Sequence, residues 1–335
     1  MSDQPSISSK PFFRTREGRI ARLFVLEIPG RAVSLCDRGA SLVSYRLGLE
    51  GDGAELIFRY GCAEQYEENP LYLGSTIGRH AGRISGAAFE LEGTRYVLDA
   101  NDGPNCLHGG PTGLHALDWE AEPFHEAGAA GVRFTTVSRD GSGGFPGTLQ
   151  LLAEYRLCEN GELSFHSEAR TDRPTPVSIT NHAYWNLGGG SDIRAHRARL
   201  FSSRRLELGP DRVPTGRVLR VEGERHDLRA PLDATSRDGF RLEGFDDYYL
   251  AERNGIARTQ TSTIADFLDP GSGRRLEVAS NAPGFVFYSG DFAGCAGFCV
   301  EPSEFPDAPN RPEFPSSLIM PGTARVLDIV WRIRS

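Results

Sequence analysis

The feature that most constrains this fold is an alternation of apolar and polar residues with a period of two. The segments with this alternation are 21–28, 149–157, 163–169, 262–269, 274–279, 284–289 and 297–301. Successive side chains of a β-strand point to opposite faces, and the Gly, Pro, Asn and Asp residues between these segments are typical of turns. Long stretches with helical spacing are missing. We therefore expect an all-β chain, a large antiparallel β-sandwich or barrel with few short helices.

The sequence contains no recognisable boundary between domains. No run of Pro, Ser or charged residues divides the 335 residues, and no internal repeat is evident. Length alone suggests two domains, but all-β chains often reach this size as one. We predict a single domain over 1–335, with a polar, flexible leader at 1–10.

Charge restricts the partners. The formal net charge is −8, whereas binding to nucleic acid or an anionic membrane needs a basic surface. Lys10 is the only lysine and lies in the polar leader, so lysine Schiff-base chemistry is excluded in practice. We expect a small-molecule partner, with the protein a monomer or a homodimer.

Cysteine usage and hydropathy indicate the compartment. The six cysteines include no Cys-x-x-Cys pair, and no His-Glu-x-x-His or calcium-loop motif occurs, so we predict reduced thiols and no metal site. No apolar stretch approaches the length of a membrane span, and no signal peptide is recognisable. We therefore expect a cytoplasmic protein.

Three loops break the strand pattern and are the expected places for a site. They are 67–84, 101–113 and 301–322. The last contains six prolines and is expected to be a stiff loop outside the sheets. Glu301 ends the preceding apolar strand, where partial desolvation could make it a general base, although a strand-end glutamate can also simply pair with an arginine. Glu304 is expected on the loop surface.

Histidines mark two further positions. If the segment 181–189 is a strand, His182, Tyr184 and Asn186 share a face opposite Ala183, Trp185 and Leu187, which is an unusual polar and aromatic stripe for a solvated face. His108 precedes Gly109-Gly110, which lets the backbone approach a ligand closely, or it serves only as a loop hydrogen-bond partner. Arg83 and Asp246 are candidate ligands for sugar oxygens or salt-bridge residues.

Taken together, the chain from about 33 to 334 resembles the aldose 1-epimerase (galactose mutarotase) family. The stretches that carry the resemblance are NPLYLGSTIGRHAGRI (69–84), NCLHGG (105–110), DGSGGFPGTLQLLAEYRL (140–157), RPTPVSITNHAYWNLGG (173–189), FDDYYL (245–250) and EPSEFPDAPNRPEFPSSLIMPG (301–322). The resemblance implies a large antiparallel β-sandwich and an isomerase that interconverts the α and β anomers of a free aldose without a cofactor.

The resemblance also implies roles for particular residues. Glu301, His182 and His108 match the catalytic set, and the expected substrate-binding residues are Arg83, Asp246, Asn181 and Tyr184. Gly82, Asp247 and Val286 depart from the common family pattern, which leaves the preferred sugar open.

Three alternatives remain at this stage. A relative could act on a different or phosphorylated sugar. A glycosidase could use Glu301 with Asp246 as a carboxylate pair. A carbohydrate-binding protein would need no catalysis at all.

Overall fold

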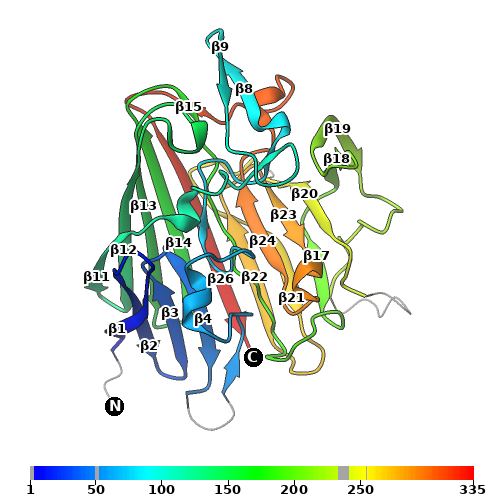
Figure 1. Cartoon of the computed structure of the whole chain (residues 1–335). Helices are drawn as coiled ribbons and strands as arrows, with labels where there is room; N and C mark the ends of the chain where they lie inside the picture. Colours follow the sequence, from blue (N-terminus) through cyan, green and yellow to red (C-terminus); the bar gives the residue numbers. More distant parts are fainter. Residues whose placement is uncertain (1–3, 50–52, 233–240, 254) are drawn as a thin grey trace.

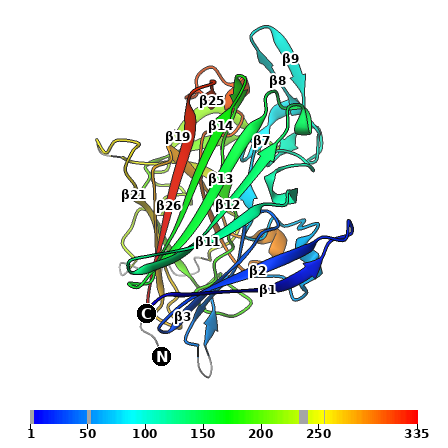
Figure 2. The same cartoon turned by 90° about the vertical axis from the view of Figure 1, so that its left-hand side faces the viewer.

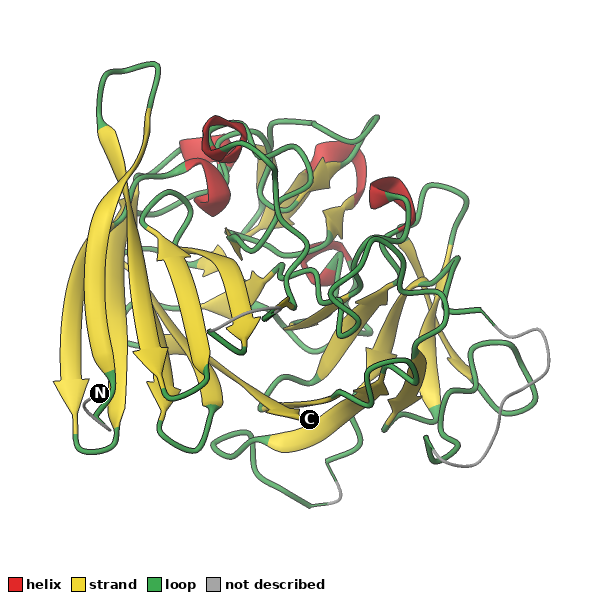
Figure 3. Ribbon diagram, turned by 90° about the horizontal axis from the view of Figure 1, so that it is seen from below, coloured by secondary structure: helices red, strands yellow, loops and turns green. Residues whose placement is uncertain are grey.

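The computed structural model describes residues 4–49, 53–232, 241–253 and 255–335. β-Strands make up most of its regular structure, and the helices are short (Figures 1 and 3). Its largest sheet has eight strands in the order β11 (Glu120–Glu126), β12 (Ala129–Ser138), β13 (Leu149–Cys158), β14 (Glu162–Thr171), β26 (Ala324–Arg334), β22 (Arg275–Ser280), β21 (Ser262–Leu268) and β17 (Arg197–Leu200).

Two five-stranded sheets accompany it. The N-terminal sheet consists of β1 (Ser6–Arg14), β2 (Ile20–Ile28), β3 (Arg31–Cys36), β4 (Ser41–Leu47) and β5 (Ala54–Glu55). We call the other the site sheet; its order is β19 (Pro214–Arg220), β18 (Arg204–Leu208), β20 (Asp246–Leu250), β23 (Gly284–Tyr288) and β24 (Cys299–Ser303).

Short elements fill the connections. Two-stranded ribbons pair β6 (Thr76–Ile77) with β16 (Thr180–Asn181), β7 (Arg83–Ile84) with β10 (Cys106–Leu107), β8 (Ala88–Leu91) with β9 (Thr94–Val97), and β15 (Thr175–Pro176) with β25 (Leu318–Ile319). The 3-10 helices are η1 (Ala63–Tyr66), η2 (Ser85–Ala87), η3 (Leu114–Ala116), η4 (Ser142–Gly144), η5 (Asp291–Ala293) and η6 (Ala308–Asn310). In the described residues, no helix is long and apolar enough to cross a membrane.

Both five-stranded sheets pack on the same face of the eight-stranded sheet. Phe134 of β12 lies on the same face as Phe267 of β21, as the antiparallel registers show. Phe134 meets Phe24 of the N-terminal sheet at 6.0 Å between ring centroids, and Phe267 meets Phe287 of the site sheet at 5.6 Å. One continuous core of buried side chains thus joins all three sheets, as expected for a β-sandwich. Figures 1 and 2 show how the strands of these sheets are arranged.

The sequence predicted the fold class and the main strands correctly. The strand expected at 149–157 is β13, and that expected at 284–289 is β23. The Asn160-Gly161 turn joins β13 to β14, which pair as an antiparallel hairpin. These strands could be predicted because one face of each is buried and the other is not, and this difference appears in the sequence as alternating apolar and polar residues.

Two predictions about segments need correction. The flexible leader at 1–10 is wrong from Ser6 onward, because β1 begins there and pairs with β2 through Arg14. The loop at 301–322 is not entirely outside the sheets. Pro302 continues β24, and Leu318–Ile319 pairs with β15. Pro302 is tolerated because β24 is an edge strand of the site sheet.

Candidate active site

A pocket of about 420 Å³ opens where the site sheet meets the loops that precede β6 and β7 and the loops that follow β10 and β16. Glu301 lies on β24 and stands opposite Val286 of β23 in the strand register. The lining residues are Pro70, Leu71, Tyr72, Gly82, Arg83, Leu107, His108, His182, Tyr184, Asp246, Val286, Tyr288, Phe292 and Glu301. Six of the seven predicted site residues therefore meet here, although they come from distant parts of the chain.

Asn181 is the exception. Its side-chain amide donates to the carbonyl of Gly74 at 2.7 Å and to the hydroxyl of Tyr155 at 2.8 Å, and its oxygen accepts from the N–H of Ala183. All of these contacts are internal to the protein and fully buried, and Asn181 is not in the pocket lining. The predicted substrate contact is thus replaced by an internal hydrogen-bond network.

The segment after Asn181 is anchored on both sides of His182. Only Thr180–Asn181 is strand, as β16, and Trp185 forms isolated bridges to Ile57 and Phe298. The Trp185 ring is completely buried against Tyr45 and Trp331. His182 thus lies between two buried residues, Asn181 and Trp185, that are fixed by hydrogen bonds and packing. Its ring lines the pocket, and it is not part of the regular strand that the alternation predicts.

His182 and Glu301 form the closest acid–base pair of the pocket. The imidazole Nε2 lies 3.6 Å from Glu301 Oε1, and both side chains are about 5% exposed. Burial raises the pKa of Glu301 to about 8, helped by the charge of Asp246 and opposed by Arg83. Burial lowers the pKa of His182 to about 4. At pH 7 the pair therefore holds one acidic proton, with the carboxyl the favoured carrier.

His108 lies across from His182, with ring centroids 5.2 Å apart and the planes nearly perpendicular. Its backbone is left-handed (φ 56°), at the turn that Gly109 and Gly110 continue. The Gly82 N–H donates to His108 Nδ1 at 3.2 Å, which leaves Nε2 free of that bond. Burial, followed by the charges of His182 and Arg83, holds the pKa of His108 well below its usual range. His108 is thus a neutral hydrogen-bonding group.

Arg83 and Asp246 supply the charged walls. Arg83 Nε donates to Asp102 at 2.6 Å, which fixes the guanidinium. Asp246 pairs with Arg212, which lies in the turn between β18 and β19. Burial still raises the pKa of Asp246 above its usual value. Both Arg83 and Asp246 line the pocket and could bind hydroxyl groups.

Two of the three departures from the family pattern have a structural explanation. Gly82 is left-handed (φ +78°), and a Cβ there would lie 3.0 Å from Pro306 Cβ. Asp247 does not line the pocket. It follows Asp246 on β20, so it points to the opposite face and pairs there with Arg205 and His226. Only Val286 places a changed side chain on the pocket wall.

Sequence reasoning missed several aromatic residues of the pocket. Tyr72 packs edge-on to His108 at 4.9 Å and stacks with His182 at 5.9 Å. Tyr288 and Phe292 also line the pocket, and Phe292 is 74% exposed. Phe292 lies in the short η5 turn, which Gly290 and Gly294 flank. A large aromatic residue in a glycine-rich turn was the one sequence feature that could have suggested a place in the pocket.

A metal ion is the other ligand that this set of residues could hold. Atoms of His108, His182 and Glu301 that could bind a metal lie within 4.8 Å of one another. Among the described residues this is the one such group. The sequence predicts no metal here, and this stays a prediction.

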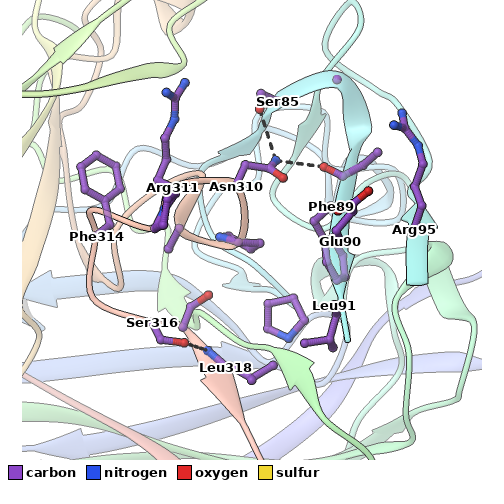
Figure 4. A pocket seen from close by; sticks show the side chains of 17 residues that line it. Ser85, Phe89, Glu90, Leu91, Arg95, Asn310, Arg311, Phe314, Ser316 and Leu318 are labelled. Atoms are coloured by element: carbon purple, nitrogen blue, oxygen red, sulfur yellow. Dashed lines mark hydrogen bonds between the residues drawn. The ribbon is translucent and has the colours of Figure 1, made fainter. Parts of the chain in front are cut away.

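A second cavity of about 640 Å³ lies beside the β8–β9 hairpin and the proline-rich loop (Figure 4). Asn310 bridges its walls by donating to Ser85 Oγ and the carbonyl of Ala88. Its lining has no histidine or cysteine, and Glu90 is its one carboxylate. The acid–base groups thus gather in the smaller pocket.

The fold and the pocket define an all-β protein with a buried acid–base pair at the wall of a small pocket. The model of the family described as aldose 1-epimerase matches residues 22–330. This chain belongs to that family, whose members are isomerases.

Named relatives cover most of the chain. Galactose mutarotase from Bos taurus is 35% identical over 289 residues, covering 82% of each chain. Aldose 1-epimerase from Escherichia coli (strain K12) is 32% identical over 320 residues, covering 89% of this chain and 90% of its own.

Solved structures show the same fold. An aldose epimerase homologue from C. elegans superposes with a TM-score of 0.81 at 26% identity, covering 91% of this chain and 96% of its own. A galactose 1-epimerase from Lactobacillus acidophilus NCFM gives 0.84 at 24% identity over 98% of both chains.

Proposed function

We propose that this protein interconverts the α and β anomers of a free aldose, with Glu301 and His182 as the two proton-transfer groups. The observation that carries the proposal is the pair itself: a carboxylate and an imidazole 3.6 Å apart, both buried, at the wall of one small pocket. Membership of the aldose 1-epimerase family supports the reaction, and the two side chains provide the base and the acid that it needs.

The reaction needs one proton taken and one given. Glu301, as the carboxylate, takes the proton of the C1 hydroxyl, while protonated His182 delivers one to the ring oxygen. The ring opens, the C1–C2 bond rotates, and closure on the other carbonyl face reverses the two roles. The form Glu⁻/HisH⁺ contains the same number of protons as the neutral pair before the sugar binds. Substrate binding therefore only has to move a proton between the two groups, and none is taken from solvent.

The other pocket residues hold the sugar. Arg83 and Asp246 bind hydroxyl groups from two sides, and His108 donates a hydrogen bond from Nε2 to a ring substituent. Tyr184 stacks on His182 at 5.0 Å between centroids and closes the wall behind it. Orientation of this kind is a large part of catalysis, because it replaces a chance encounter by a fixed geometry.

The remaining proposals concern the protein as a whole. We propose one domain, a cytoplasmic location, no nucleic-acid or membrane partner, and a monomer or homodimer. The common core of all three large sheets supports the single domain. The net charge of −8 supports the absence of nucleic-acid and anionic-membrane partners.

The test is polarimetry on freshly dissolved α-anomers. The protein should accelerate the relaxation of optical rotation, and Glu301→Gln and His182→Asn should each lower kcat by at least about 100-fold. Wild-type rates in both variants would contradict the assigned roles. Dialysis against EDTA should leave the rate unchanged, since no step uses a metal.

A panel of sugars decides the substrate. Glucose, galactose, xylose, arabinose and a hexose 6-phosphate should be compared by kcat/KM. Val286 places an apolar side chain where a hydroxyl-binding group would favour one sugar, so a shallow preference among the free aldoses is expected. A strong preference for the phosphate would identify a relative with a different substrate. Release of a chromophore from an aryl glycoside would indicate a glycosidase.

A further inference from the structure

His182 has two ring nitrogens, and the pocket uses only one of them. Nε2 faces Glu301, whereas Nδ1 lies 3.4 Å from the sulfur of Cys299. We infer that Cys299 is a positioning residue, whose thiol holds Nδ1 and thereby keeps the proton-transfer nitrogen Nε2 directed at the sugar. The inference deepens the proposed function and rests on it for its catalytic meaning.

The position of Cys299 follows from the strand. Cys299 and Glu301 are two residues apart on β24, so their side chains lie on the same face. One short strand thus provides both the carboxylate and the partner of the imidazole. Cys299 is completely buried, in a cluster that also contains Tyr184 and Tyr288. A shift of β24 would move Glu301 and the support of His182 together.

A thiol suits both protonation states of the imidazole. Burial, together with the charges of Glu301 and Asp246, holds the pKa of Cys299 well above its usual value, so the sulfur keeps its hydrogen. The sulfur can accept from Nδ1–H of the neutral ring and of the protonated ring alike, so this contact persists while Nε2 gains and loses its proton. A carboxylate in this place would also accept from Nδ1–H, but its charge would favour the protonated ring, whereas the thiol adds no charge.

The neutral ring therefore has a defined tautomer. With Nδ1–H donating to the sulfur, the ring proton is on Nδ1, and Nε2 faces the pocket with a free lone pair. This is the arrangement that ring closure requires, since neutral His182 must then take a proton at Nε2. The titratable groups around the imidazole are Cys299, Glu301, Tyr72, Tyr184, His108 and His115. Among them, Cys299 is the one within hydrogen-bonding distance of Nδ1.

The experiment compares Cys299→Ala, Cys299→Ser and a matched control. Cys36→Ala is the control, because Cys36 is also completely buried and belongs to the same apolar cluster but lies outside the pocket. Two quantities are measured: kcat by polarimetry, and the tautomer of His182 by ¹⁵N NMR of histidine-labelled protein without sugar, with His182→Asn assigning the signal.

Cys299→Ala should lower kcat by about 10-fold or more, the size of effect seen when the hydrogen-bond partner of a metal-binding histidine is removed, and should add the Nε2–H tautomer to the spectrum. Cys299→Ser keeps an acceptor for Nδ1–H and should restore most of kcat and the Nδ1–H form. Cys36→Ala should keep the wild-type kcat and spectrum, even if its Tm falls.

Three results would overturn the inference: a wild-type spectrum with the proton on Nε2, an unchanged kcat in Cys299→Ala, or a serine variant as impaired as the alanine variant. Because the NMR measurement uses no sugar, it tests the role of Cys299 even if the wild-type protein shows no mutarotation. Failure of the proposed function is thus distinguishable from failure of this inference.

Discussion

At the scale of single residues, the pocket is governed by burial of the pair Glu301 and His182. Their pKa values, about 8 and about 4, are displaced in opposite directions, and both displacements favour the neutral form. An isolated glutamate would be ionised at pH 7, and this is the basis on which sequence alone suggests a base. In the pocket the two groups titrate as a coupled pair, so the protonation state that matters for catalysis is the number of protons on Glu301 and His182 together.

The first residue-scale prediction concerns the pH dependence of activity. Between about pH 4 and about pH 8 the pair holds one acidic proton, so kcat/KM should be nearly flat. Below this window a second proton removes the base, and above it loss of the proton removes the acid, so the rate should fall on both sides. Polarimetry from about pH 3.5 to about pH 9.5, corrected for spontaneous mutarotation, measures the profile. A rate that keeps rising through pH 9 would show that Glu301 does not control the alkaline limb.

The second residue-scale prediction concerns stability. In the unfolded chain Glu301 ionises near its ordinary pKa of 4.5, but in the folded protein near 8. Its stabilising contribution is therefore complete below pH 4.5 and is lost as the pH rises to 8. Glu301→Gln does not titrate, so its Tm advantage over the wild type should grow with pH, by at least about 2 °C between about pH 5 and about pH 8.5.

Calorimetry at the two pH values measures this difference. Glu90→Gln is the control, because Glu90 is an exposed glutamate of β8. The control should differ from the wild type by the same small amount at both pH values. A Tm difference for Glu301→Gln that does not change with pH would contradict the raised pKa.

Which site residues could be found from the sequence depended on how local their environment is. His108 and Glu301 adjoin a Gly-Gly turn and a proline-rich loop, and these are features of the chain itself. Asn181 was misplaced for a different reason, because it is turned inward by Tyr155, a residue 26 positions away. The sequence also does not reveal the strand register that turns Asp247 away from the pocket. Glu304, expected on the surface, is buried by ion pairs with Arg258 and Arg325.

At the scale of elements, the site depends on how the proline-rich loop is fastened to β7. Asp307 is fully buried at the start of η6 and accepts hydrogen bonds from the N–H and Oγ of Ser85 and from Arg311 Nε, all at 2.9–3.0 Å. Its own N–H donates to the carbonyl of Arg83 at 2.9 Å. The loop that follows Glu301 thus holds the strand that carries Arg83.

The element-scale prediction is that Asp307→Ala loosens this connection. Loss of a buried, multiply bonded carboxylate should cost about 3 kcal/mol of stability, and KM should rise more than kcat falls, since Arg83 binds substrate. Denaturant unfolding and steady-state polarimetry measure the two effects. Glu313→Ala, an exposed change on the same loop, should stay within about 0.5 kcal/mol. An unchanged KM for Asp307→Ala would show that Arg83 is held by Asp102 alone.

Strands were easier to predict from the sequence than their partners. Period-two alternation identified β13, β14, β21, β22 and β23 because it records which face of each strand is buried. The sheet order β14–β26–β22 joins segments far apart in the chain, and no local pattern encodes it. β1 was missed for a related reason. It is an exposed, polar edge strand, so it shows little alternation, and its pairing with β2 is what orders it.

At the scale of the whole molecule, the three large sheets meet around Trp185. Its backbone bridges Ile57 and Phe298, and its ring packs on Tyr45 of the N-terminal sheet and Trp331 of the eight-stranded sheet. His182 lies three residues earlier, so the same segment joins the core and supplies the site. The pocket is therefore coupled to the global fold, and cannot be stable as a local structure in a partly unfolded chain.

This coupling predicts that activity and global structure are lost together. Tryptophan fluorescence, far-UV circular dichroism and residual mutarotation should follow one denaturant curve, because the buried Trp119, Trp185 and Trp331 report on the common core. Trp185→Phe should shift this curve by roughly 1–3 kcal/mol through lost packing, and should move activity and fluorescence by the same amount. If activity disappeared in an earlier transition while the fluorescence of Trp331 was retained, the site sheet and its loops would unfold separately, and the single core would not be one cooperative unit.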